Sequence, residues 1–231
     1  MKRDKFIIAG SKPWHHADFE SRDLSPHHDW TYVSNHDELI AAVSASAPSY
    51  IFFLHWNWHV PAEIFLNYEC VCFHMTDVPY GRGGTPLQNL IVRGHAETQL
   101  SALQMVQEMD AGPVYTKRQL ALDGSAREIY GRAAELSWSI IDWMVLDRPV
   151  PTEQIGFAEY FERRRPAQSE LPVSGPLSAI YNHIRMLDAE TYPLAFLDHG
   201  IFRLEFTNVA QEDGSLRAEC TISIRRESKK K

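Results

Sequence analysis

A histidine at the end of an expected buried strand is the residue best suited to chemistry in this sequence. The apolar run 70–73 reads as a strand that leads into His74, and a polar, glycine-rich loop and a helix from Pro86 follow. In open α/β sheets, ligands bind at the carboxyl ends of the strands, and glycines let a backbone approach a ligand closely. His74 suits proton transfer there, and Arg82 could clamp an anion such as a phosphate. A buried histidine followed by a flexible loop is an equally weighted alternative, and 81–84 lacks the Lys-Ser/Thr pair of a P-loop.

A carboxylate that could work with this histidine lies further along the chain. Asp110 falls in the expected turn 109–112, between two strands. An aspartate can orient a histidine by accepting a hydrogen bond from one ring nitrogen. Taken alone, however, Asp110 reads better as an ordinary turn residue.

Histidines are concentrated in the first third of the chain, where eight of the eleven precede residue 75. His55 and His59 have the i, i+4 spacing of a metal-binding pair on a helix. The preceding strand and the neighbouring Trp56 and Trp58 argue against a helix there. We therefore expect no metal.

The remaining pattern predicts the scaffold that positions these residues. Apolar runs predict strands at 6–10, 31–33, 50–54, 70–73, 98–106 and 114–119, and helical spacing predicts helices at 38–46, after Pro61, at 87–93 and at 125–145. The stretch 11–29 lacks periodicity and reads as a loop. Strands that alternate with helices predict an α/β fold with a mainly parallel sheet.

The last third of the chain has a different composition. Residues 149–176 hold five of the thirteen prolines and read as an extended segment that wraps the surface. A helix at 177–187 and a hairpin of strands at 202–206 and 218–224, with a turn at 212–214, are expected to follow. The basic tail 225–231 is expected to be solvated and dispensable.

Composition and charge narrow the class of protein. The chain has 231 residues, 44% of them hydrophobic, with a net charge of −7 and three cysteines. These values predict a globular protein of a reducing compartment, the cytoplasm, without a disulfide framework. No apolar run is long enough for a spanning helix. A nucleic-acid partner is not expected, because the only basic run is the terminal tail.

One pair of motifs resembles a known family. His74-x-Thr76-x-x-Pro79-x-x-Arg82-Gly83, followed 36 residues after the histidine by Asp110-x-Gly112, resembles the formyltransferases that use 10-formyltetrahydrofolate. Further similar elements are Thr98, Val114-Tyr115, Ile184-Arg185-Met186-Leu187 and Tyr192-Pro193-x-Ala195-Phe196. The resemblance covers about residues 50 to 200. It implies a Rossmann-like, mostly parallel sheet as the catalytic domain at 1–150, with the extended segment, helix and hairpin at 151–231 as a C-terminal extension.

Within this family the chain looks most like the short sugar N-formyltransferases. These formylate the amino group of a nucleotide-linked dideoxysugar for surface polysaccharide such as lipopolysaccharide O-antigen. The resemblance implies a UDP- or dTDP-linked 4-amino-4,6-dideoxy sugar as partner and a homodimer. Methionyl-tRNA formyltransferases are longer and carry a basic C-terminal domain, so this chain is expected to end too early and to be too acidic for their role.

The resemblance also assigns roles to residues. The sugar amine attacks the formyl carbon, His74 relays a proton, and Asp110 orients and charges His74. The family's oxyanion-stabilising Asn falls on Cys72, which becomes a third candidate catalytic position. The implied folate contacts are His55, Trp56, Asn57, Trp58, Asp110 and Val114, and the implied acceptor contacts are Thr76, Tyr80, Arg82 and Gly83. A non-catalytic binder of nucleotide sugar or folate stays open, as does another formyltetrahydrofolate enzyme, either a hydrolase or a purine transformylase.

Overall fold

The computed structural model describes residues 3–190 and 192–225, in two compact units. The first unit gathers the described chain up to Gly83 with Gln99–Leu120 and Arg132–Tyr160, and the second gathers Gly84–Thr98, Ala121–Gly131 and the chain from Phe161 onward. The expected solvated tail, apart from its first residue, lies outside the described residues. The division into domains at residue 150 stays a prediction.

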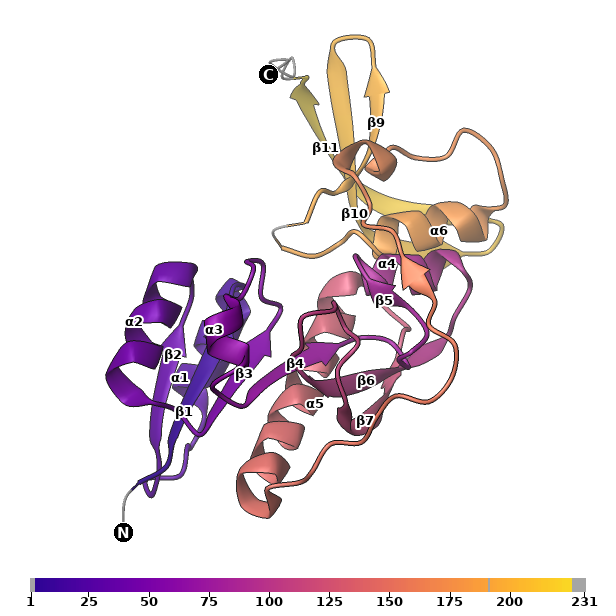
Figure 1. Ribbon diagram of the computed structural model, residues 1–231. Helices are drawn as coiled ribbons and strands as arrows, with labels where there is room; N and C mark the ends of the chain where they lie inside the picture. Colours follow the sequence, from indigo (N-terminus) through magenta and orange to yellow (C-terminus); the bar gives the residue numbers. More distant parts are fainter. Residues whose placement is uncertain (1–2, 191, 226–231) are drawn as a thin grey trace. The chain divides into compact units, whose positions relative to one another are not determined.

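A six-stranded sheet forms the core of the first unit, in the order β2-β1-β3-β4-β6-β7 (Figure 1). Its strands are β1 (Lys5–Gly10), β2 (Asp29–Val33), β3 (Tyr50–Leu54), β4 (Cys70–His74), β6 (Glu97–Gln104) and β7 (Val114–Ala121). The first four strands in this order run parallel, and β6 is antiparallel to β4. The predicted α/β fold with a mainly parallel sheet is confirmed.

The central strands are apolar on both faces because helices cover both faces. On one face, alternate residues of β1 and β3 form a buried cluster with α2 (His36–Ser46) and the short α3 (Ala62–Phe65). The other face is covered by α5 (Ala126–Asp147). The guanidinium of Arg148, the residue after this helix, lies over the rings of Phe6 and Tyr50. Parallel strands that are buried on two faces read as continuous apolar runs, which is why the sequence reveals them.

Helix α1 (Pro13–Ser21) occupies part of the stretch that was expected to be a loop. Pro13 lies in its first turn, where the missing N–H costs nothing. The helix buries only His15 and carries no apolar stripe, so its periodicity is invisible in the sequence. Phe19 contacts Trp138 of α5, and this tertiary packing substitutes for an amphipathic pattern.

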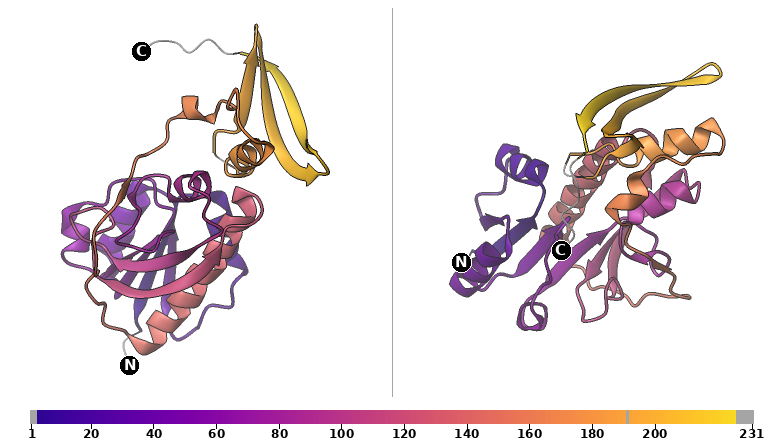
Figure 2. Two further views of the ribbon diagram at one scale, coloured as in Figure 1. Left: turned by 90° about the vertical axis from the view of Figure 1, so that its right-hand side faces the viewer. Right: turned by 90° about the horizontal axis from the view of Figure 1, so that it is seen from above.

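The second unit contains a helical part and an antiparallel sheet. Its elements include α4 (Pro86–Val92), the 3-10 helix η1 (Pro166–Ser169), α6 (Leu177–Arg185), β9 (Ala195–His199), β10 (Phe202–Glu212) and β11 (Ser215–Ile224). The predicted hairpin is confirmed and is longer than expected, as both views in Figure 2 show for its yellow strands. A third strand, β9, pairs with β10 and was not predicted.

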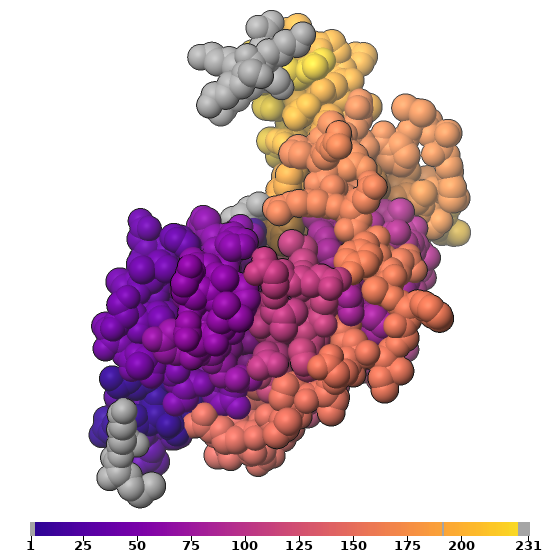
Figure 3. Space-filling model, in the orientation of Figure 1, coloured from indigo at the N-terminus to yellow at the C-terminus, as the bar shows by residue number. Residues whose placement is uncertain are grey.

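An extended segment at 149–160 follows α5 along the surface of the first unit (Figure 3). Thr152 forms an antiparallel bridge with Val114, and Glu159 donates its N–H to the carbonyl of Pro79. The strands β5 (Arg82–Gly83) and β8 (Tyr160–Phe161) form a separate two-stranded sheet. The segment thereby borders the glycine-rich loop that the sequence singles out.

Among the described residues, no helix combines the length and the apolar character that crossing a membrane requires.

Candidate functional site

His74 is the last residue of β4 and is buried, with 7% of its surface exposed. Its Nε2 lies 2.8 Å from the carbonyl oxygen of Gly81. A carbonyl only accepts, so Nε2 carries the hydrogen of this bond. Nδ1 lies 3.5 Å from Asp110 Oδ2, a contact that becomes attractive when Nδ1 also holds a proton. The imidazole is therefore arranged to take up a proton at Nδ1, beside a carboxylate.

Asp110 lies in a tight turn with a left-handed backbone, at φ 54°. Its Oδ2 also accepts a hydrogen bond of 2.9 Å from the backbone N–H of Gly83. Two residues on, Gly112 is essential to the turn, because a Cβ there would lie 1.8 Å from the carbonyl oxygen of Gln104. The structure thus brings His74 and Asp110 together from distant parts of the sequence, as the motif pair predicts.

The loop after β4 holds the residues expected on the acceptor side. Thr76 is fully buried, and its hydroxyl donates to the same Gly81 carbonyl at 3.3 Å. Tyr80 is half-buried, and its N–H donates to the carbonyl of Asp77. Gly83 has φ 101° and uses its N–H on Asp110. These contacts order the loop, and acceptor binding by its residues stays a prediction.

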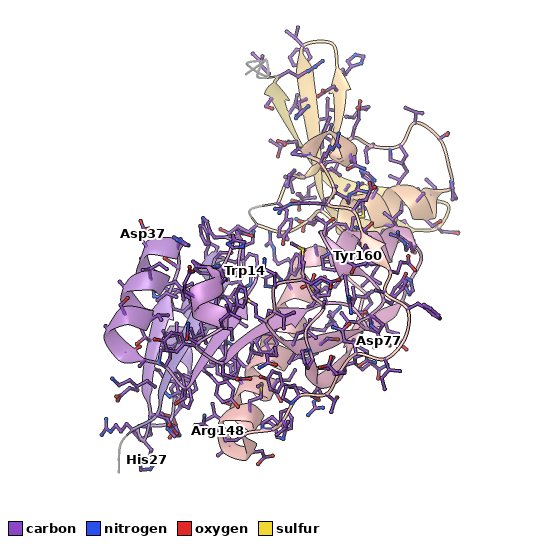
Figure 4. The ribbon with its side chains drawn as sticks, viewed as in Figure 1. Trp14, His27, Asp37, Asp77, Arg148 and Tyr160 are labelled. Atoms are coloured by element: carbon purple, nitrogen blue, oxygen red, sulfur yellow. The ribbon has the colours of Figure 1, made fainter. Side chains whose placement is uncertain are left out.

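The guanidinium of Arg82 is engaged on several sides by protein groups. Its Nε and Nη2 donate to Gln154 Oε1, at 3.1 and 2.8 Å. Its Nη1 lies 3.3 Å from Glu108 Oε1 and 3.3 Å from the hydroxyl of Tyr160, which Figure 4 labels. Arg82 therefore ties the loop to the Asp110 turn and to the extended segment.

Cys72 lies on β4 between Phe53 of β3 and Leu103 of β6. Burial raises the pKa of its thiol, and the negative charge of Asp110 raises it further. A thiol that stays protonated is a poor nucleophile and a weak hydrogen-bond donor. Its catalytic role stays a prediction, and these surroundings disfavour a thioester step.

The segment His55–Trp58 follows β3 and forms no helix, so His55 and His59 do not lie on one helical face. His55 Nδ1 lies 2.8 Å from His15 Nε2, and burial lowers the pKa of His15 to about 3 and that of His55 to about 4. Among the described residues, the buried Trp56 Nε1 has no acceptor.

Trp58 exposes 42% of its surface, and Asn57 is exposed as well. The exposed ring of Trp58 offers an aromatic face, which fits a flat heteroaromatic ring. The backbone N–H and carbonyl of Val114, by contrast, are both paired with Thr152. The folate contacts of all these residues stay predictions.

Sequence reasoning missed two participants. Gln154 sits in the proline-rich segment, where nothing marks it, yet it binds both Arg82 and the Asp110 turn. His15 lies in the stretch expected to be a loop. The described residues contain no group of three histidine, cysteine or carboxylate side chains that could hold a metal ion.

Comparisons with known proteins give the family. Residues 166–223 match the family model described as the C-terminal domain of methionyl-tRNA formyltransferase. The solved methionyl-tRNA formyltransferase from Clostridium thermocellum is 42% identical with a TM-score of 0.91, and the match covers 96% of this chain and 100% of that chain.

More distant relatives match as well. The methionyl-tRNA formyltransferase of Lactobacillus acidophilus is 26% identical over 168 residues, which are 68% of this chain and 52% of that protein. The chain thus spans about half the length of the curated relatives it matches. A solved 4-N formyltransferase from Francisella tularensis is 13% identical with a TM-score of 0.64 and coverage of 96% and 98%, which shows the fold alone.

The chain belongs to the formyltransferase family, an enzyme family whose formyl donor is 10-formyltetrahydrofolate. The expected family, fold and donor are confirmed. The predicted sugar branch, with its nucleotide-linked amino sugar, is wrong, because the relative that is 42% identical over its whole length is a methionyl-tRNA formyltransferase. Of the readings left open, another formyltetrahydrofolate enzyme is the one supported.

The exclusion of a nucleic-acid partner is wrong for the same reason. Residues 166–223 match the very domain that was expected to be missing. The net charge misled because it averages two different regions: residues 1–160 hold 12 basic and 20 acidic residues, whereas 161–231 hold 11 and 10. The expected homodimer stays a prediction.

Proposed function

We propose that this enzyme formylates the amino group of methionyl-tRNA in the cytoplasm. The observation that carries the proposal is the 42% identity to a methionyl-tRNA formyltransferase over the whole of that chain. The match of residues 166–223 to the C-terminal domain of such enzymes supports it. The three free cysteines fit a reducing compartment.

In this proposal His74 transfers the proton of the attacking amine, and Asp110 stabilises the protonated form of His74. The donor supplies an electrophilic formyl carbon, to which the amine nitrogen bonds as the bond from that carbon to the folate nitrogen breaks. His74 Nδ1 takes the proton that the amine loses and returns it to the folate nitrogen. The Asp110 carboxylate, 3.5 Å away, stabilises the imidazolium in between. Acid–base catalysis of this kind contributes about 10²–10⁴-fold to the rate.

The loop geometry supports the assignment of the proton to Nδ1. Nε2 already donates to the Gly81 carbonyl, so Nδ1 is the nitrogen left to exchange protons. The Gly83 N–H donates to Asp110 Oδ2 and so keeps the carboxylate in place beside His74. The donor ring would lie against the segment His55–Trp58, where Trp58 exposes an aromatic face.

A direct assay tests the proposal. Purified enzyme, 10-formyltetrahydrofolate and radiolabelled methionyl-tRNA should give formyl-methionyl-tRNA, and His74→Ala should reduce the rate by about 10²–10⁴-fold. Free methionine and methionyl-tRNA with a blocked amino group serve as controls. An enzyme that binds tetrahydrofolate but forms no product above the His74→Ala background would overturn the proposal.

A further inference from the structure

Gln154 occupies a central place in the hydrogen-bond network around the candidate site. The extended segment that carries it is fixed on one side by the Thr152–Val114 bridge, with N···O distances of 2.7 and 2.9 Å. On the other side, Glu159 bonds to the Pro79 carbonyl and accepts from the N–H of Arg82. The segment therefore spans from the Asp110 turn to the loop after β4, and Gln154 lies between the two.

The side-chain amide of Gln154 is saturated. Its Nε2 donates to the carbonyl oxygens of Asp110 and Gly112, both at 2.8 Å. Its Oε1 accepts from Nε and Nη2 of Arg82. Because a guanidinium only donates and a carbonyl only accepts, the amide has one workable orientation.

These bonds bear on the conformation of Asp110. A non-glycine residue at φ 54° persists only where its surroundings hold it. Gln154 donates hydrogen bonds to the carbonyls of Asp110 itself and of Gly112, so its amide fixes the peptide planes of the turn. The same turn aims Oδ2 at the Gly83 N–H and at Nδ1 of His74.

We propose that Gln154 is a positioning residue, which holds the Asp110 turn so that the carboxylate faces His74. Arg82 shares this role by fixing the amide oxygen of Gln154. The proposal rests on the proposed function for its kinetic consequence, because a carboxylate that drifts from His74 no longer stabilises the protonated ring. Misplacement of a catalytic group by about 1 Å can cost about 100-fold in rate.

The kinetic test compares two neighbouring positions. Gln154→Met keeps the length of the side chain and removes all four hydrogen bonds, and Glu153→Met at the exposed adjacent residue is the matched control. Gln154→Met should lower kcat by about 10- to 100-fold with both KM values within about twofold, and the control should be unchanged. Gln154→Glu keeps an acceptor for Arg82 but turns an oxygen toward the two carbonyls. Its kcat should therefore fall as much as that of Gln154→Met.

A second readout does not depend on turnover. In protein with ¹⁵N-labelled histidine, the Nδ1 signal of His74, assigned with a His74→Gln variant, should shift in Gln154→Met and stay in place in Glu153→Met. If the wild type fails to formylate methionyl-tRNA while this shift appears, the proposed function falls and the positioning role stands. If the wild type is active and both Gln154 variants keep its kcat and its His74 signal, the positioning role is overturned.

Discussion

The pairing of His74 with Asp110 makes a quantitative prediction. The ring nitrogen and the carboxylate oxygen are 3.5 Å apart, and both side chains are largely shielded from water, with 9% and 16% of their surfaces exposed. When the ring is protonated, two unit charges at this separation attract by about 5 kcal/mol at an effective dielectric constant of 20. The cost of desolvating the two charges and their hydrogen bonds to other groups offset part of this attraction. A coupling free energy of about 2–3 kcal/mol between His74 and Asp110 is therefore expected.

The perturbation is a double-mutant cycle with His74→Ala and Asp110→Asn. The introduced amide still accepts from the Gly83 N–H, so the loop keeps its contact while the charge is lost. Each single variant should lose about 10²–10⁴-fold in turnover, with tetrahydrofolate binding retained. A coupling of 2–3 kcal/mol means that the double variant falls short of the product of the two losses by about 30- to 150-fold.

The assay is formylation of methionyl-tRNA under saturating 10-formyltetrahydrofolate, with tetrahydrofolate binding followed separately by tryptophan fluorescence. Losses that add within about 0.5 kcal/mol would mean that the two side chains act independently. A His74→Ala variant that keeps most of its turnover would refute the assignment outright. Loss of folate binding in either single variant would show that the pair supports the donor site rather than proton transfer.

Three further predictions concern residues around this pair. Cys72→Ala should cost turnover far less than His74→Ala, because burial keeps the thiol protonated; equal losses in kcat would point to thiol chemistry. Gly112→Ala should destabilise the fold by about 1–3 kcal/mol in urea unfolding, because the new Cβ would lie 1.8 Å from the Gln104 carbonyl; an unchanged midpoint would contradict this. Folding lowers the pKa of His15 to about 3 and that of His55 to about 4, so the native state binds fewer protons than the unfolded chain. The free energy of unfolding should therefore be highest above about pH 6.5 and should fall as the pH drops toward 4. The slope is at most about 1.4 kcal/mol per pH unit for each ring, and it should flatten in His15→Phe; a wild-type unfolding midpoint that stays constant from pH 7 to 5 would count against the neutral pair.

The sequence was sufficient to predict those elements whose burial shows in the pattern of their own residues. The strands 50–54 and 70–73 are visible because both faces of a parallel sheet are covered, which demands an apolar side chain at nearly every position. Helix α1 was hidden because its stability comes from contacts such as that of Phe19 with Trp138. Strand β9 was hidden because only its first two residues are buried, and it forms as a third strand against a hairpin that already shows its own alternation.

The residues of the candidate site also differ in whether the sequence could predict them. His74 and Asp110 could be paired because their two motifs together resemble those of a known family, whereas Asp110 taken alone reads as an ordinary turn residue. Gln154 could not, because a glutamine in an extended segment acquires its role only when the chain brings it beside Arg82 and the Asp110 turn. A polar residue whose partners are backbone carbonyls leaves no pattern in its own neighbourhood.

The acceptor was misjudged for a different physical reason. The motif pair places a proton-transfer histidine beside a carboxylate at the end of β4, and this arrangement serves formyl transfer to any amine. Nothing in that geometry selects between a sugar and an aminoacyl group, so the acceptor has to be read from other residues. The net charge of −7 was used for this purpose, yet the excess of acidic residues lies entirely within 1–160, and residues 161–231 are nearly balanced. Because electrostatic attraction to phosphates is screened within about 8–10 Å, the charge that a nucleic acid meets is that of the nearest surface and not that of the whole chain.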